Sequence, residues 1–214
     1  MSRPTRRARI LIADDHEMVV DGLRKLLEDE FEVAGTVDDG RALLAAAQRL
    51  QPDVILVDVS MPLLNGIDAC ARLRALVPSS RAVVLTMHAD PSYAAEAFRA
   101  GAAGYVLKGS ATSELLRAIR AVLRGQRYLA RGLPASILAR AQPPGEARPG
   151  HVTARQREVL QLVAEGRSAK EIGALLGISV KTVEFHKARL MDQLELRTTA
   201  ELTRYAVQHG IVAS

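Results

Sequence analysis

Five polar side chains in the first half of the chain end, or directly follow, short apolar runs that are typical of buried β-strands. They are Asp14, Asp15, Asp58, Thr86 and Lys108. Because ligands of open parallel sheets bind beyond the carboxyl ends of the strands, we expect these side chains to meet at one edge of a sheet. Three carboxylates at close range repel one another unless a cation neutralises them, and their oxygens suit Mg2+. The pattern therefore predicts a Mg2+ site.

An aspartate after a strand is also a common turn residue or helix cap, and this interpretation is adequate for any single position. It does not explain why all five side chains, a lysine and a threonine included, come at strand ends. A carboxylate beside a metal ion and a lysine is a competent nucleophile toward phosphorus, because both cations withdraw charge from the transferring group. The cluster thus favours phosphoryl chemistry.

Residues 8–123 supply the elements that must position this cluster. They alternate between short β-like runs and longer helical ones, which is typical of βα units around a parallel sheet. The expected strands are 9–13, 32–37, 54–57, 82–86 and 104–107. Five helical segments lie between and after them. We therefore predict an α/β domain over residues 1–131, with a five-stranded, doubly wound parallel sheet.

Proline and glycine punctuate the stretch 132–150, which is interpreted as a linker with one short helix at 135–141. Residues 151–214 then contain four helical segments and no β-like run, so they predict a small all-α domain. The helices are expected to start near Arg155, Ala169, Val180 and Thr199. Capping-box spacing occurs at Thr153 and Gln156 and again at Ser168 and Glu171, and Gly177 ends the second helix. The short turn before the third helix predicts a helix-turn-helix.

The third helix of this domain has one apolar side and one polar, basic side when successive residues are placed 100° apart. The outward side carries Lys181, Phe185, Ala188 and Arg189, with Thr182 and Glu184 at its margins. Such a face suits the major groove of DNA, where basic groups meet guanine edges or phosphates and apolar groups meet thymine methyls. An ordinary solvated helix has a similar charge pattern. The exposed Phe185 favours the DNA-reading interpretation.

Residues 8–125 resemble the response-regulator receiver family. The matching motifs are ILIADDH at 10–16, DVSMPLLNG at 58–66, LTMH at 85–88 and GYVLKG at 104–109. The resemblance implies a flavodoxin-like topology and Mg2+-dependent phosphorylation of Asp58 by a histidine kinase. It implies that Asp15, Asp58 and the Ser60 carbonyl bind the ion, with Asp14 acting mainly through water. Lys108 would pair with the phosphoryl oxygens.

The same resemblance names Thr86 and Tyr105 as a switch. The phosphoryl group adds negative charge and strong hydrogen-bond acceptors, which the Thr86 hydroxyl can satisfy by moving inward. Tyr105 would then enter the space that Thr86 leaves. Without a switch, the two residues are a strand-end threonine and a half-buried tyrosine.

Residues 151–212 resemble the LuxR-type helix-turn-helix of the NarL and FixJ group of regulators. The matching residues include Thr153, Glu158, Gly166, Ser168, Lys170, Glu171, Ser179, Thr182 and His186, whereas Gln156, Ala169 and Gly173 depart from the usual pattern. The resemblance implies that the helix from Val180 enters the groove and that the last helix supports a dimer. The expected DNA-binding residues are Ser168, Lys170, Lys181, Thr182, Glu184, Phe185, His186, Lys187 and Arg189.

Together these features predict a transcription regulator, not an enzyme in the usual sense, which binds an inverted DNA repeat as a phosphorylated homodimer. The family resemblance suggests that the unphosphorylated receiver covers the DNA-reading surface or blocks pairing. A phosphohydrolase would need a general acid two residues after Asp58, where Ser60 stands. A flavin domain would need a phosphate-binding loop where Asp14 and Asp15 lie. A small-molecule sensor would need an aromatic-lined pocket, which three Phe, four Tyr and no Trp make improbable.

The amino-acid composition contributes less to the prediction of function than these motifs do. The formal charge of +5 is spread over both halves, with 18 basic and 16 acidic residues in 1–131 and 11 and 8 in 132–214. Individual positions must therefore carry the nucleic-acid argument. The single Cys70 cannot form an internal disulfide and is expected in the core. No run reaches the length of a membrane span, so we expect a cytoplasmic protein without a membrane partner.

Overall fold

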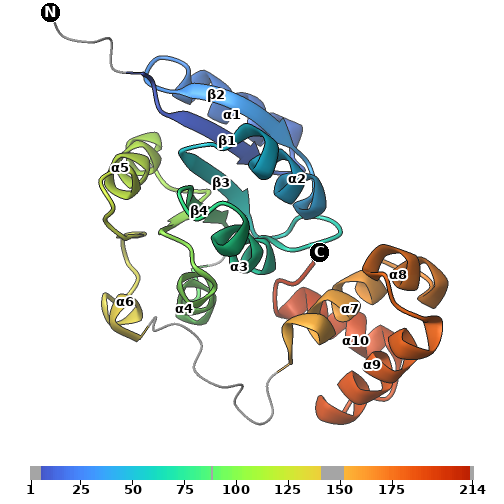
Figure 1. Ribbon diagram of the computed structural model, residues 1–214. Coiled ribbons are helices and arrows are strands. Elements are labelled where there is room, and N and C mark those ends of the chain that lie inside the picture. Colours follow the sequence, from blue (N-terminus) through green and yellow to red (C-terminus); the bar gives the residue numbers. More distant parts are fainter. Residues whose placement is uncertain (1–5, 88, 141–151, 213–214) are drawn as a thin grey trace, which may run out of the picture.

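The computed structural model describes residues 6–87, 89–140 and 152–212. Within this part of the chain, six parallel strands form one sheet in the order β2-β1-β3-β4-β5-β6 (Figure 1). Their bounds are β1 Arg9–Ala13, β2 Glu32–Val37, β3 Val54–Asp58, β4 Arg81–Thr86, β5 Gly104–Leu107 and β6 Tyr128–Leu129. The sheet confirms the predicted doubly wound fold, with one strand more than expected.

Helices cover both faces of the sheet. They are α1 Glu17–Leu27, α2 Gly40–Leu50, α3 Gly66–Leu76, α4 Pro91–Ala100 and α5 Thr112–Leu123. Alternate strand residues point to opposite faces, so Leu11 packs with the helices α2 to α4 while Ile10 and Ile12 pack with α1 and α5. Both faces of the inner strands β1, β3, β4 and β5 are mostly buried, which explains why their sequences are nearly continuously apolar.

The extra strand β6 lies where no strand was predicted. The Tyr128 N–H donates to the Ala103 carbonyl at 3.0 Å, and the Ala130 N–H donates to the Tyr105 carbonyl at 2.8 Å. Two residues are too few for a periodic pattern, so main-chain pairing alone defines this strand. The expected short helix follows as α6 Ser136–Arg140, and it packs on α4 with Ile137 buried. The rest of the expected linker, residues 141–150, lies outside the described residues.

The second domain consists of α7 Ala154–Ala164, α8 Ala169–Leu176, α9 Val180–Gln193 and α10 Thr199–Gln208 around its own apolar core. Capping boxes begin α7, α8 and α10, which confirms the two predicted boxes and adds the one at Thr198 and Glu201. Gly177 ends α8 in the left-handed region with φ of 65°. A Cβ on Gly173 would lie 2.8 Å from the Ile178 carbonyl oxygen, so the turn between α8 and α9 requires a glycine there.

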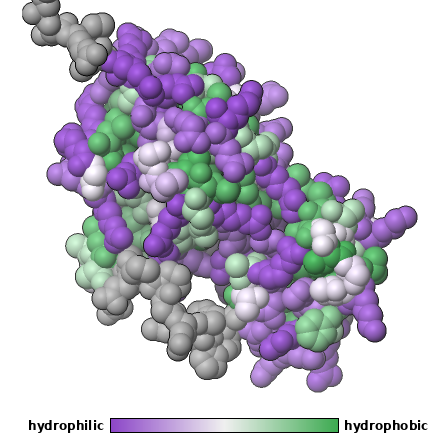
Figure 2. All heavy atoms as spheres, in the orientation of Figure 1, coloured by the Kyte–Doolittle hydropathy of each residue, from purple (hydrophilic) through white to green (hydrophobic). Residues whose placement is uncertain are grey.

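The two domains lie side by side, with α7 and the end of α10 next to α3 and with α9 on the side away from the sheet (Figure 1). In the view of Figure 2 the surface of both domains is mainly hydrophilic, which agrees with two separate cores. Every helix in residues 6–87, 89–140 and 152–212 is too short or too polar to cross a lipid bilayer.

Candidate functional site

The predicted acidic residues converge at the carboxyl ends of β1 and β3. Asp14, Asp15, His16 and Asp58 each offer one ligand atom, and these four atoms all lie within 4.8 Å of one another. Asp14 and Asp58 are buried, whereas Asp15 and His16 are exposed. His16 joins this cluster, because its Nδ1 lies 3.1 Å from an Asp14 oxygen and 2.9 Å from an Asp15 oxygen. The site is therefore open to solvent on one side.

Lys108 reaches this cluster from the end of β5. Its Nζ lies 2.8 Å from an Asp14 oxygen and 3.1 Å from an Asp58 oxygen. Burial raises the pKa of Asp58; Lys108 opposes this rise and the nearby Asp14 carboxylate adds to it. Burial lowers the pKa of Lys108, but contacts with both carboxylates outweigh burial and leave that pKa raised. The ammonium thus stays charged and neutralises part of the carboxylate repulsion.

The predicted switch residues lie on the neighbouring strands β4 and β5. Thr86 is buried, and the Tyr105 side chain is fully buried and hydrogen bonds with Thr86. Burial raises the pKa of Tyr105 beyond its ordinary value despite that hydrogen bond. The alternative of a half-buried tyrosine without a switch role does not fit this burial. β5 holds Tyr105 between α4 and the sheet, where the ring packs in the core.

The loop after Asp58 is fixed by close backbone contacts. Ser60, whose carbonyl is the predicted metal ligand, lies in this loop between β3 and α3. The Gly66 N–H donates to the Val59 carbonyl at 2.9 Å, and Asn65 caps α3 by accepting from the Asp68 N–H. Leu63 adopts a left-handed conformation with φ of 65°, which is unfavourable for a residue with a Cβ. The loop conformation must be held by its surroundings.

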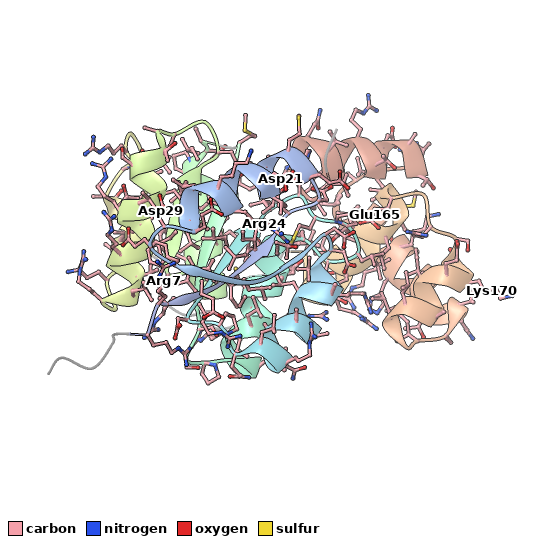
Figure 3. The ribbon with its side chains drawn as sticks, turned by 90° about the horizontal axis from the view of Figure 1, so that it is seen from above. Arg7, Asp21, Arg24, Asp29, Glu165 and Lys170 are labelled. Atoms are coloured by element: carbon pink, nitrogen blue, oxygen red, sulfur yellow. The ribbon has the colours of Figure 1, made fainter. Side chains whose placement is uncertain are left out.

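The predicted DNA-reading surface is displayed to solvent on α9. Lys181, Glu184, Phe185 and Arg189 are exposed, whereas Val183 and Leu190 are buried in the domain core, as the helical spacing predicts. Three further predicted contacts, Thr182, His186 and Lys187, are partly exposed. Ser168 and Lys170 are exposed at the start of α8, and Figure 3 places Lys170 at the end of the domain farthest from the sheet. All nine predicted DNA-binding residues are thus accessible.

Two family models match the chain and divide it where the fold does. The response regulator receiver domain matches residues 10–120, and the model for bacterial regulatory proteins of the luxR family matches residues 151–206. The chain belongs to the response regulators with a LuxR-type DNA-binding domain. The resemblance found in the sequence motifs is confirmed.

Curated relatives match this response regulator over its whole length. It is 40% identical to the transcriptional regulatory protein MctR of Rhizobium johnstonii over 207 residues, which are 96% of this chain and 95% of that protein. It is 32% identical to the response regulator UvrY of Escherichia coli, covering 94% of each chain. It is also 32% identical to the response regulator GacA of Pseudomonas aeruginosa, covering 95% of this chain and 97% of the other.

Solved structures show the same two-domain architecture. The RcsB response regulator of Salmonella typhimurium is 29% identical and aligns with a TM-score of 0.67, covering 94% of this chain and 97% of that one. RcsB in complex with DNA is 28% identical and aligns with a TM-score of 0.66, covering 93% of this chain and 98% of that one. The receiver and the helix-turn-helix domain therefore have the fold of known response regulators.

Sequence reasoning missed a polar interface between the two domains of this response regulator. The buried Gln161 of α7 donates through its side-chain nitrogen to the Met61 carbonyl at 2.9 Å. Its side-chain oxygen accepts from the Asn65 N–H at 2.8 Å. Glu165, one turn further along α7, accepts from the Leu63 N–H at 3.0 Å and points toward the receiver (Figure 3). One helix of the DNA-binding domain thus holds the loop that follows Asp58 at three backbone positions.

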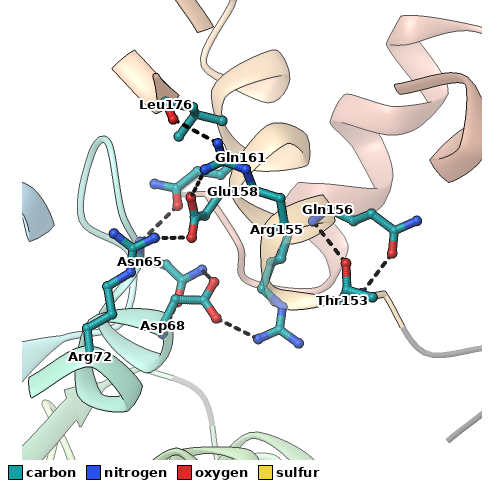
Figure 4. Close-up of polar contacts among 10 residues, drawn as sticks. Asn65, Asp68, Arg72, Thr153, Arg155, Gln156, Glu158, Gln161 and Leu176 are labelled. Carbon is teal, nitrogen blue, oxygen red and sulfur yellow. Dashed lines mark hydrogen bonds and ion pairs between the residues drawn. The ribbon is translucent and has the colours of Figure 1, made fainter. Parts of the chain in front are cut away.

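Ion pairs flank these hydrogen bonds (Figure 4). Arg157 of α7 lies 2.9 Å from an Asp68 oxygen on α3 and 2.6 Å from a Glu96 oxygen on α4. Arg72 of α3 pairs with the buried Glu158 of α7. Burial raises the pKa of Asp68, although Arg157 opposes that rise. The only sequence signal for this interface is a polar row on α7 at a spacing of four residues, which ordinarily indicates a solvated face.

Proposed function

We propose that this response regulator accepts a phosphoryl group on Asp58 and controls transcription by binding DNA through α8 and α9. The convergence of Asp14, Asp15 and Asp58 with Lys108 at one sheet edge carries this proposal. Asp58 is the residue of the cluster that ends the central strand β3, and Lys108 contacts it directly. Histidine kinases are the expected donors, since the chain contains a receiver domain.

The phosphoryl transfer uses few protein groups. A carboxylate oxygen of Asp58 forms a bond to phosphorus while the phosphorus–nitrogen bond of the donor's phosphohistidine breaks, and the released imidazole takes up a proton. Lys108 stabilises the charge on the transferring oxygens from its position 3.1 Å from Asp58. Thr86 then donates its hydroxyl to the phosphoryl, which requires a rearrangement of its contact with Tyr105.

The acidic cluster fits a divalent cation. Asp14, Asp15 and Asp58 each offer a carboxylate oxygen within 4.8 Å of the others, and carboxylate oxygens are ligands that Mg2+ prefers. Asp15 and Asp58 would bind the ion directly together with the Ser60 carbonyl, and Asp14 would act through water. When bound, Mg2+ supplies positive charge to the phosphoryl oxygens. His16 lies on the exposed side of the cluster, with its Nδ1 2.9 Å from an Asp15 oxygen.

DNA binding rests on the exposed face of α9. Lys181 and Arg189 are suited to guanine edges or phosphates, Glu184 to cytosine and Phe185 to a thymine methyl. Thr182, His186 and Lys187 lie at the borders of this face, and the start of α8 places Ser168 and Lys170 where a phosphate is favoured by the helix dipole. We propose that a homodimer binds an inverted repeat. A solved structure of two RcsB dimers bound to two parallel DNAs, 30% identical to this chain, supports a dimer on DNA.

The phosphorylation proposal is tested by mass spectrometry after treatment with acetyl phosphate. We expect one added phosphoryl group in the presence of Mg2+, loss of that addition in EDTA, and none in Asp58→Asn. Asp53→Asn is the matched control, because Asp53 lies before β3 and its side chain accepts from Arg6 and from the Arg9 N–H, away from the acidic cluster. An unmodified wild-type protein would refute the proposal.

The DNA-binding proposal is tested by selecting duplexes from a random-sequence pool. Lys181→Ala combined with Arg189→Ala should weaken binding at least tenfold and reduce its salt dependence, because two cationic contacts are lost. Lys25→Ala combined with Arg49→Ala is the control, since both residues are exposed on receiver helices. Unchanged binding by the α9 double variant would show that another surface contacts DNA.

A further inference from the structure

The second domain contacts the receiver on one side and carries the DNA-reading surface on another. The side-chain hydrogen bonds and ion pairs that α7 and its C-cap make to the receiver involve Arg157, Glu158, Gln161 and Glu165. The segment that follows α10 also lies beside the receiver. Within the described part of the chain, the exposed α9 side chains Lys181, Phe185 and Arg189 make no hydrogen bond or ion pair to the receiver. Figure 1 places α7 next to α3 and α9 on the opposite side of the domain.

The exposure of α9 agrees with this placement. Phe185 is 58% exposed and Val180 is 47% exposed, although both are apolar, and Lys181 and Arg189 are exposed as well. If the receiver covered α9, these apolar groups would be the first to be buried, because burying apolar surface is the main driving force for docking. The receiver instead buries the polar Gln161, which is 1% exposed.

The acidic side chains at the interface between the domains are paired with arginine side chains. Asp68 and Glu96 both pair with Arg157, and Glu158 pairs with Arg72 and Arg155. Each of these acids would repel DNA phosphates if it were unpaired and close to them. The docked arrangement thus confines their charge to the interface and leaves the basic residues of α9 on the other side.

We infer that the docked arrangement is itself competent to bind DNA. The receiver contacts the DNA-binding domain on the side of α7 and leaves α9 uncovered. This inference rests on the proposed DNA-binding function of α9. Coverage of the DNA-reading surface by the receiver, one of the two modes of control that the family resemblance suggests, does not fit this geometry. Each chain can present its recognition helix while its receiver stays docked.

A reversible covalent lock across the interface tests this inference. Arg72→Cys combined with Glu158→Cys places two thiols where an ion pair joins the domains, within reach of a short bis-methanethiosulfonate linker. The other interface contacts, from Gln161 and Arg157, are kept. The native Cys70 is buried and does not compete for the reagent. Affinity is measured for a duplex selected by the wild-type protein, first locked and then after reduction.

We expect the locked and the reduced protein to differ less than threefold in affinity. The matched control is Glu30→Cys combined with Arg120→Cys, which joins an ion pair within the receiver and leaves the domain interface free. A locked protein that binds at least tenfold more weakly and recovers on reduction overturns the inference. The inference is also overturned if the cysteines at positions 72 and 158 fail to cross-link while those at positions 30 and 120 do cross-link. If neither the wild type nor the reduced variant selects or binds DNA, the proposed function itself fails.

Discussion

Gly66 passes so close to Asp58 that a Cβ on Gly66 would lie 2.0 Å from the Asp58 backbone carbonyl oxygen. Neither atom can move away easily, because the Gly66 N–H is bonded to the Val59 carbonyl at 2.9 Å. We therefore expect Gly66→Ala to lower the free energy of unfolding by about 3 kcal/mol or more and to abolish phosphorylation of Asp58. Urea unfolding followed by circular dichroism, together with mass spectrometry, measures both effects.

Gly22→Ala is the control for this substitution. Gly22 lies within α1, and an added Cβ there meets nothing within 4 Å. Alanine is the better helix former, so the free energy of unfolding should rise by about 0.5–1 kcal/mol. Equal losses at Gly22 and Gly66 would mean that the close approach to Asp58 is not the cause.

Gln161→Ala should loosen the loop after Asp58. The substitution leaves the Asn65 N–H and the Met61 carbonyl without their partner, and a lost buried hydrogen bond costs about 1–3 kcal/mol. Hydrogen exchange of the Asn65 amide should accelerate about tenfold or more. Gln48→Ala, at an exposed position on α2, should leave that rate unchanged. An unaltered Asn65 rate in Gln161→Ala would mean that the loop is held without this side chain.

Lys108→Ala should make the receiver depend on Mg2+ for stability. Without the ammonium, the buried Asp14 and Asp58 carboxylates lose their shared cation, which costs on the order of 3 kcal/mol. We expect Mg2+ to stabilise the variant more than it stabilises the wild type, because only the ion can then neutralise the pair. Thermal unfolding with and without Mg2+ gives the comparison, and Lys25→Ala serves as the exposed control. Equal Mg2+ effects in all three proteins would argue against an ion at this site.

Cys70 should not react with thiol reagents at neutral pH in the folded protein. The side chain is buried on α3, and burial raises the pKa of its thiol to about 12, so the reactive thiolate is scarce. Titration with a chromogenic disulfide should detect no thiol in buffer and one thiol in denaturant. Rapid reaction of the native protein would show that α3 opens readily.

The apolar pattern of the sequence predicts most of this fold, since the five main strands and the helices that cover them have clear periodicity. A strand of two residues has no such periodicity. β6 is defined by main-chain hydrogen bonds from Tyr128 and Ala130, which the pattern of side chains does not reveal. The burial of Tyr105 also escaped prediction, because a tyrosine at a strand end suits either a core or a surface position.

The acidic site was predictable because strand ends meet at one edge, which brings Asp14, Asp58 and Lys108 together without knowledge of any loop. The interface between the domains was not predictable in the same way. Arg157 and Gln161 are polar residues on an amphipathic helix, and such residues usually face water. Only the presence of a second domain opposite α7 makes them partners of Asp68 and Asn65.

The separation of α7 from α9 also bears on how such regulators diversify. Within the described part of the chain, the side chains of α7 that bind the receiver are distinct from the predicted DNA-binding side chains of α8 and α9. A duplicated gene can therefore acquire new promoters through changes on α9 while its response to the original signal stays intact. The α7 contacts to the receiver can likewise change as the protein adapts to another kinase, without a change in the DNA sequence that α9 recognises.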